Sequence, residues 1–162
     1  MALDNLIYDR TIDNVQTIKD LSKIRYQDMT TEQRQSWIDN IKKGCYTYID
    51  LNRVEGAVAY LDDRLKKSGI SCDIELGKTW LKDDIPTIQD MQRYINNIIN
   101  IRKLNIVLDT TPPSPERVNI DYIEANNIER ILHDVDLMLV ELTQQYLYSG
   151  EFYSGGDFLW KK

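Results

Sequence analysis

The chain has 162 residues, a length that suits one domain, and 26 acidic against 20 basic side chains give it a formal net charge of −6. Hydrophobic residues make up 42% and charged residues 28%, an ordinary globular balance that argues against an intrinsically disordered chain. The lysines and arginines are scattered in short pairs, so the sequence offers no basic patch for nucleic acid.

The first predicted helix begins after Asp9, whose carboxylate can accept the unpaired backbone N–H groups of the opening turn. Apolar residues then recur every three to four positions, at Ile12, Val15, Ile18, Leu21 and Ile24. The second helix begins at a capping box in residues 30–33 and ends at Gly44. Its predicted inner face consists of Trp37, Ile38 and Ile41.

The third helix is predicted from an Asp50 cap to Gly69, because period, cap and stop signal agree. Its apolar stripe is Leu51, Val54, Val58, Leu61 and Leu65. Alternating apolar and polar residues in positions 70–76 then indicate a short strand or extended segment.

Thr87, with Asp90 three residues later, caps the fourth predicted helix. Its stripe is Ile88, Met91, Tyr94, Ile95, Ile98 and Ile101. Three prolines within residues 110–115 predict a semi-rigid loop between two packed helices. The fifth helix is predicted from Asp121, with Glu124 completing a capping box, to Tyr146.

The fifth helix also has a second apolar face, formed by Tyr122, Leu137 and Val140. A helix that is apolar on two sides is usually central in its bundle, although the second face can instead meet another chain. The predicted fold class is therefore all-α or nearly so: a five-helix antiparallel-type bundle with one short extended segment and an aromatic C-terminal tail. The bundle domain spans residues 1–146 and the tail residues 147–162.

Aromatic residues are concentrated in this tail, where Ser-Gly and Gly-Gly links predict that no regular helix persists. Two interpretations remain open: the aromatics fold back over their own domain, or they insert into pockets on a partner. The candidate partner-binding residues are Tyr148, Phe152, Tyr153, Phe158 and Trp160.

Candidates for chemistry are few. His133 is the only histidine, and Glu129 and Asp136 lie one turn before and after it, a spacing that would suit a metal site or an acid–base pair. His133 lies off the apolar stripe, however, which favours a surface histidine in contact with Glu129. We therefore predict no catalytic residue, no metal and no cofactor.

Other unusual residues have structural interpretations. Cys45 and Cys72 are predicted to be reduced, partly buried thiols, since no second cysteine pair completes a zinc site or redox motif. Trp37 is predicted in the core and Trp80 as a loop anchor. The start of the chain shows no secretion signal, and its apolar runs, such as residues 137–140, are too short to span a bilayer, which favours a reducing cytosol and no membrane.

Several sequence blocks carry a family resemblance. They are residues 50–55, 57–61, 84–87 and 124–132, which read DLNRVE, AVAYL, DIPT and EANNIERIL. Together with Trp37 and the Tyr-Ser-Gly-Glu of residues 148–151, they resemble small helical proteins and modules of Firmicutes tailed phages and prophages, mostly uncharacterised or labelled tail-associated. The resemblance covers about residues 8–153 and brings no agreed catalytic residues.

The resemblance implies a non-enzymatic structural or adaptor component of a phage or prophage tail. Such a component would be made in the host bacterial cytoplasm, be located in the virion after assembly, and bind other tail or virion proteins or copies of itself. The alternative is a small acidic cytosolic regulator that binds a host or phage enzyme through its helical surface.

Overall fold

The computed structural model describes the backbone of residues 3–116 and 118–156, and side chains within these ranges up to residue 144. Over these ranges the regular structure is helical and contains no strand, which confirms the all-α class. Residues 70–76 are extended and form no ladder, so the alternating pattern marks an extended segment and not a strand.

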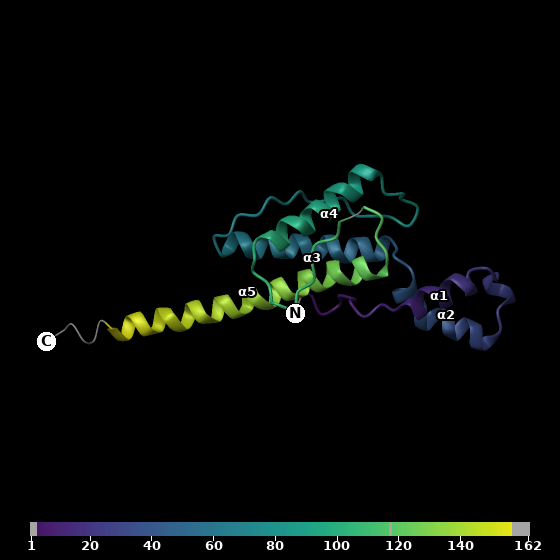
Figure 1. Cartoon of the computed structure of the whole chain (residues 1–162), viewed down its shortest axis with the longest axis horizontal. Coiled ribbons are helices and arrows are strands. Elements are labelled where there is room, and N and C mark those ends of the chain that lie inside the picture. The colour runs from purple at the N-terminus through teal and green to yellow at the C-terminus, as the bar shows by residue number, and fades with distance from the viewer. Residues whose placement is uncertain (1–2, 117, 157–162) are drawn as a thin grey trace.

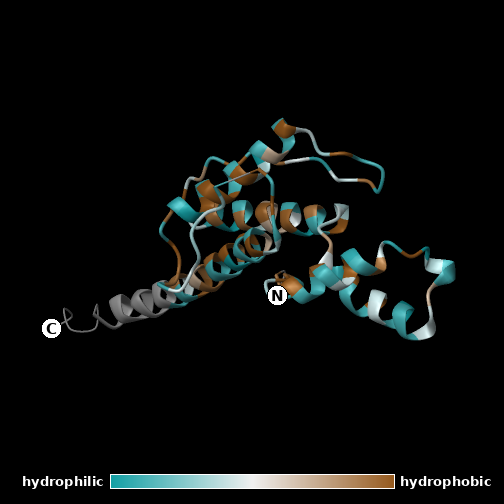
Figure 2. Cartoon of the chain, turned by 45° about the vertical axis from the view of Figure 1, so that its right-hand side comes forward, coloured by the Kyte–Doolittle hydropathy of each residue, from teal (hydrophilic) through white to brown (hydrophobic). Residues whose placement is uncertain are grey.

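Three helices form the body of the molecule (Figure 1). They are α3 (Tyr48–Lys67), α4 (Ile88–Lys103) and α5 (Tyr122–Gly156). The helix α5 packs against both α3 and α4, more extensively than those two pack against each other, which confirms its predicted central place. Figure 2 shows hydrophobic and hydrophilic residues alternating along these helices, as expected when each buries one face.

The core of the body combines the predicted stripes of these three helices. Fully buried side chains come from each of them, and include Val54, Leu61, Leu65, Ile98, Ile101, Ile128, Ile131, Leu132 and Leu139. Burial of each such aliphatic side chain contributes about 1.5–3 kcal/mol to folding. The body therefore has the interlocked interior that the periodicity predicts.

The helices α3, α4 and α5 run in the same direction. Arg53 of α3 pairs with Glu129 of α5, and farther along both helices Arg64 pairs with Asp136. Arg93 of α4 pairs with Glu55 of α3, and Figure 1 shows that α4 and α3 begin at the same end of the body. The prediction of an antiparallel arrangement is therefore wrong.

The long connections explain this topology. Residues 68–87 link α3 to α4 and residues 104–121 link α4 to α5. The 16 residues of α4 rise about 24 Å, a distance that about eight extended residues cover. Each connection is therefore long enough to return the chain to the end where the helices begin, whereas short loops would have enforced antiparallel neighbours.

The helices α1 (Ile12–Leu21) and α2 (Thr31–Gly44) form a separate hairpin beside the start of α3, joined by the short helix η1 (Tyr26–Asp28) (Figure 1). They pack mainly against each other, so the chain does not form a single five-helix bundle. The predicted inner residue Ile38 is 55% exposed, and Trp37 is half-buried where a core position was predicted. The reason is that α2 is covered on one side only.

Two predicted helix caps are shifted. The N-cap of α1 is Thr11, which forms a capping box with Asn14, while Asp9 instead pairs with Lys43. The N-cap of α3 is Thr47. Asp50, predicted as that cap, is the third helical residue, and its carboxylate accepts the Thr47 backbone N–H at 2.8 Å. Asp50 therefore stabilises the start of α3, as predicted, but it lies inside the helix and not at the N-cap.

The other predicted caps are confirmed. Reciprocal capping boxes join Thr30 with Gln33, Thr87 with Asp90, and Asp121 with Glu124. The proline-rich loop connects α4 to α5 as predicted, and its buried Thr111 donates a hydrogen bond from Oγ1 to Oδ2 of Asp134 at 2.7 Å.

The helix α5 continues through Gly156, although the sequence predicted its end at Tyr146. A glycine within a helix costs about 1 kcal/mol relative to alanine, a penalty that weakens a helix without forbidding it. The last part of α5 runs beyond the body as a single helix (Figure 1).

Candidate interaction surface

Side-chain amides hold the connection between α3 and α4 against the body. Asn97 accepts a hydrogen bond from the Glu75 backbone N–H at 3.0 Å and donates one to the Glu75 carbonyl at 2.8 Å. Asn52 binds the N–H and carbonyl of Trp80 in the same way, both at 2.8 Å. Each amide thus satisfies both backbone groups of one residue, as a neighbouring strand would.

Beyond Trp80 the connection forms a fixed turn. Trp80 is 1% exposed, which confirms the predicted loop anchor, and the Lys78 ammonium lies 4.6 Å from the centroid of its ring system. The Leu81 carbonyl accepts the Asp84 N–H at 3.1 Å, and the Asp84 carboxylate accepts the Leu81 N–H at 2.8 Å. That hydrogen bond, aided by Lys78, lowers the pKa of Asp84 below its usual range.

This fixed segment nevertheless exposes large aliphatic side chains, which we call the apolar loop. Its members and their exposed fractions are Leu76 at 55%, Leu81 at 66%, Ile85 at 87% and Ile88 at 75%. Single exposed aliphatics are normal on a protein surface, but several on one short ordered segment indicate a contact site. The loop is preorganised by these hydrogen bonds, so it would itself lose little conformational entropy on binding a partner.

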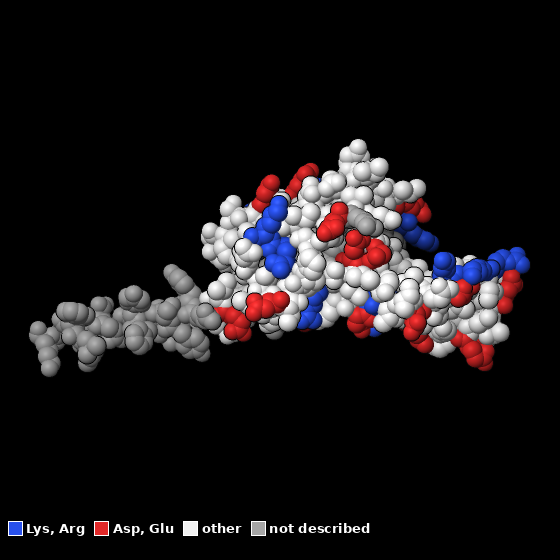
Figure 3. All heavy atoms as spheres, in the orientation of Figure 1, with Lys and Arg blue, Asp and Glu red and all other residues white. Residues whose placement is uncertain are grey.

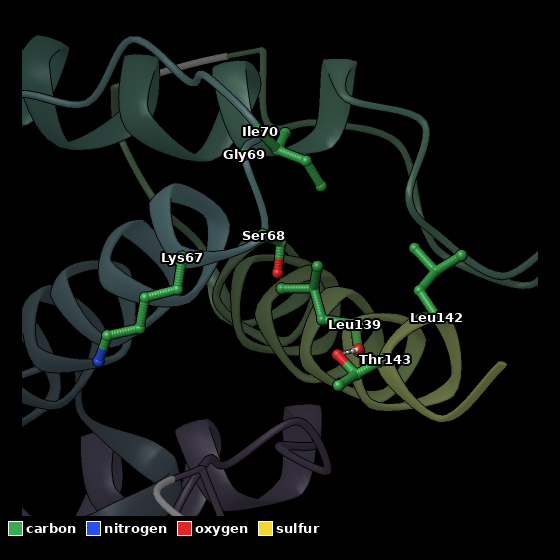
Figure 4. A pocket seen from close by; sticks show the side chains of 7 residues that line it. All are labelled: Lys67, Ser68, Gly69, Ile70, Leu139, Leu142 and Thr143. Atoms are coloured by element: carbon green, nitrogen blue, oxygen red, sulfur yellow. Dashed lines mark hydrogen bonds between the residues drawn. The ribbon is translucent and has the colours of Figure 1, made fainter. Parts of the chain in front are cut away.

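A groove of about 630 Å³ opens where α3 ends, and we call it the α3–α5 groove. Its walls come from the end of α3, the start of the connection and α5, and comprise Lys67, Ser68, Gly69, Ile70, Leu139, Leu142 and Thr143 (Figure 4). Gly69 adopts a positive φ of 72°, which turns the chain out of α3 and which glycine tolerates best. Leu142 is 43% exposed on the wall formed by α5.

The apolar loop and the α3–α5 groove lie at opposite ends of the body. The loop precedes α4, near the end where the three helices begin, whereas the groove surrounds the end of α3 (Figure 1). The parallel direction of α3 and α4 produces this separation.

A buried ionic cluster joins the N-terminal segment to α3 and α5. Glu129 is fully buried and contacts Arg10 at 2.6 Å and Arg53 at 2.7 Å. Asp50 pairs with the same two arginines at 3.1 and 2.5 Å. Burial opposes the charge of Arg53, but its bonds to Glu129 and Asp50 prevail and raise its pKa above the usual value. The cluster balances two cations with two anions and acts as a structural link.

The residues proposed for a metal or acid–base site are not brought together. Glu129 is committed to the ionic cluster, and Asp136 pairs with Arg64. Half-buried His133 contacts Asp134 at 3.0 Å, not the predicted Glu129, and packs beside Tyr8. Within residues 3–116 and 118–144, no group of three or more potential metal ligands converges.

The two cysteines match their prediction. Both Cys45 and Cys72 are free and half-buried. Burial raises the pKa of each thiol, so both are poor nucleophiles near neutral pH.

The predicted partner-binding residues fall in the last part of the chain. The backbone positions of Tyr148, Phe152 and Tyr153 lie in α5, but their side chains are outside the described residues. Phe158 and Trp160 lie outside the described residues entirely. Their role in binding stays a prediction.

Sequence reasoning missed the apolar loop and the groove. Leu81 and Ile85 follow no strand or helix period, so their exposure left no pattern to detect. Ile88 was predicted in the apolar stripe of the fourth helix, but as the first residue of α4 it is 75% exposed. The available signal was Trp80 followed by the Asp83-Asp84 turn, which marks an anchored loop but not the exposure of its neighbours.

Comparisons of the chain with protein-family models, curated proteins and solved structures find no match. Among the residues that the structure describes, no helix is long and apolar enough to span a membrane.

Proposed function

We propose that the protein is a non-enzymatic structural or adaptor component of a phage or prophage tail. In this role it is made in the bacterial cytoplasm and assembles with other virion proteins or with copies of itself. The sequence blocks described above motivate the phage setting, and exposed apolar surface on an ordered body supports work through protein contacts.

The observation that carries the proposal is the continuation of α5 beyond the body. Residues 143–156 would extend about 21 Å as a helix, and an isolated helix of this length is marginal in water. A neighbouring protein that packs along it would stabilise it. Leu137 and Leu142, 41% and 43% exposed where α5 leaves the body, would extend such a contact.

The direct test is to locate the protein in particles. Purified tailed particles from the producing strain are probed with an antibody against the chain, by immunoblot and by gold labelling in the electron microscope. We expect label on the tail. A protein that stays in the soluble lysate and is absent from the particles would contradict the proposal.

A second test removes residues 147–162. Because the body ends before them, we expect helix content to fall only by the removed turns, while assembly measured by light scattering weakens. Loss of the folded body in circular dichroism would instead show that these residues stabilise their own domain.

The alternative, an acidic regulator, rests on the net charge of −6. Figure 3 shows acidic and basic side chains interspersed over the visible face, which does not favour a surface of one sign there. A regulator of this kind would lose its partner as salt rises, because exposed charges are screened within about 8 Å at physiological ionic strength. Apolar assembly would resist salt.

A further inference from the structure

We propose that copies of this chain associate head to tail, with the apolar loop of one copy seated in the α3–α5 groove of the next. The inference deepens the proposed function by naming a second copy as the partner, and it rests on that function only for its biological setting.

The two surfaces are complementary in shape. The loop is convex, with Ile85 87% and Ile88 75% exposed, and the amide contacts of Asn52 keep it in one conformation. The groove is concave, with about 630 Å³ of space, within the range of pockets that enclose a small ligand. Aliphatic side chains of Ile70 and Leu142 line it, so it offers apolar contact to an aliphatic loop (Figure 4).

Charge also favours this pairing. Lys67 lies at the rim of the groove, with 74% of its side chain exposed, while the exposed Asp83 lies within the apolar loop. Lys67 pairs with Asp63 one turn earlier in α3, but an exposed pair of this kind contributes little and can be exchanged. Docking the loop would therefore bring Asp83 towards one accessible cation, Lys67.

The placement of the two surfaces determines the kind of assembly. Different patches at opposite ends of one body give a heterologous contact, which forms a ring if the rotation closes and an open filament if it does not. Since Leu142 and Thr143 lie where α5 leaves the body, the docked copy would lie beside residues 143–156. There it would pack along the part of α5 that runs beyond the body (Figure 1).

Single substitutions test each surface. Ile85→Glu alters the loop, Leu142→Glu alters the groove, and Ile38→Glu is the matched control, because Ile38 is 55% exposed on α2, away from both surfaces. Sedimentation equilibrium of the full chain should show association about tenfold to hundredfold weaker for the first two variants. The control should match wild type, and circular dichroism should show that all variants are folded.

Mixing the two defective variants gives the sharper test. The Ile85→Glu protein keeps an intact groove and the Leu142→Glu protein an intact loop, so an equal mixture should form a one-to-one dimer and nothing longer. An isologous contact would not be restored by mixing. A wild-type protein that stays monomeric at millimolar concentration, or a mixture that stays monomeric, would overturn the proposal.

Truncation separates this inference from the proposed function. The fragment 1–146 retains both surfaces, so its head-to-tail association should persist, although more weakly because the contact along the end of α5 is lost. If that fragment is monomeric while full-length Ile85→Glu still associates, the end of α5 is the contact and the inference is wrong, although the proposed function stands. Absence from tailed particles, with head-to-tail association intact, would overturn the proposed function alone.

Discussion

The body and the α1–α2 hairpin use the same local signals but reach very different degrees of burial. In the body each helix has neighbours on two sides, and residues such as Leu61 and Ile131 are fully buried. In the hairpin α2 has no buried residue, and Ile12 and Ile38 are more than half exposed. An amphipathic period therefore predicts a helix, while the number of packed layers decides how much of its apolar face is covered.

The body holds both ends of the hairpin. At its entry, Arg10 and Asn126 exchange two hydrogen bonds through the Arg10 backbone, at 3.0 and 2.9 Å. At its exit, the hydroxyl groups of Tyr46 and Tyr94 lie 2.5 Å apart. The hairpin is thus an insertion whose position depends on contacts made within the body.

The largest expected effect comes from breaking the link between the regions. Glu129→Ala leaves Arg10 and Arg53 buried with half of their negative partners, so we expect the free energy of unfolding to fall by about 3–5 kcal/mol. Urea denaturation measures the change. Glu141→Ala, at an exposed position of the same helix, is the control and should change it by less than about 0.5 kcal/mol. Equal effects would show that the cluster contributes nothing specific.

A smaller effect is expected from Gly44→Ala in the hairpin. A Cβ at Gly44 would lie 2.5 Å from the Asn14 carbonyl oxygen and 2.5 Å from Cγ1 of Ile18, so α1 and α2 would have to separate. We expect a loss of about 1–3 kcal/mol, with hydrogen-exchange protection lost in the hairpin and retained in the body.

Gly56→Ala is the matched control for that variant. Nothing lies within 4 Å of a Cβ at Gly56, which is in the interior of α3. This variant should be more stable than wild type by about 0.5–1 kcal/mol. Uniform loss of protection in Gly44→Ala would show that the two regions unfold together.

The smallest expected effect appears at alkaline pH. Burial, followed by the neighbouring Tyr46, raises the pKa of Tyr94 well above its ordinary value of about 10. Above about pH 10, the Tyr94 side chain loses its phenolic proton in the unfolded chain but keeps it in the folded chain. The free energy of unfolding therefore falls as pH rises. Urea denaturation from pH 8 to 11 should show a shallower fall for Tyr94→Phe. An unchanged slope would contradict this.

The helix starts were predictable where the signal is local. The capping boxes at 30–33 and at Thr87 need only residues three positions apart. Asp50 was assigned to the wrong side of its helix start because its carboxylate has two functions: it binds the Thr47 N–H and it joins the ionic cluster. Sequence spacing reveals the first function and conceals the second.

The direction of the helices and the candidate surface needed distant contacts that no local pattern carries. The ionic cluster joins Arg10 to Glu129, which are 119 positions apart. Asn52 and Asn97 lie within helices, where an amide usually faces solvent, so nothing in the sequence indicates that they hold a distant backbone segment. Trp80 was predicted as an anchor because a large aromatic residue in a polar loop needs a place to be buried.

The long-range contacts of the N-terminal segment set the order of events during synthesis. The Ile7 N–H donates to the carboxylate of Glu129, and the Arg10 N–H donates to the side chain of Asn126. These hydrogen bonds cannot form until residues more than a hundred positions later have been translated. At about 5–20 residues added per second, that interval lasts about 6–24 seconds. During this time the hairpin can form on the ribosome, whereas the body closes only once α5 has emerged.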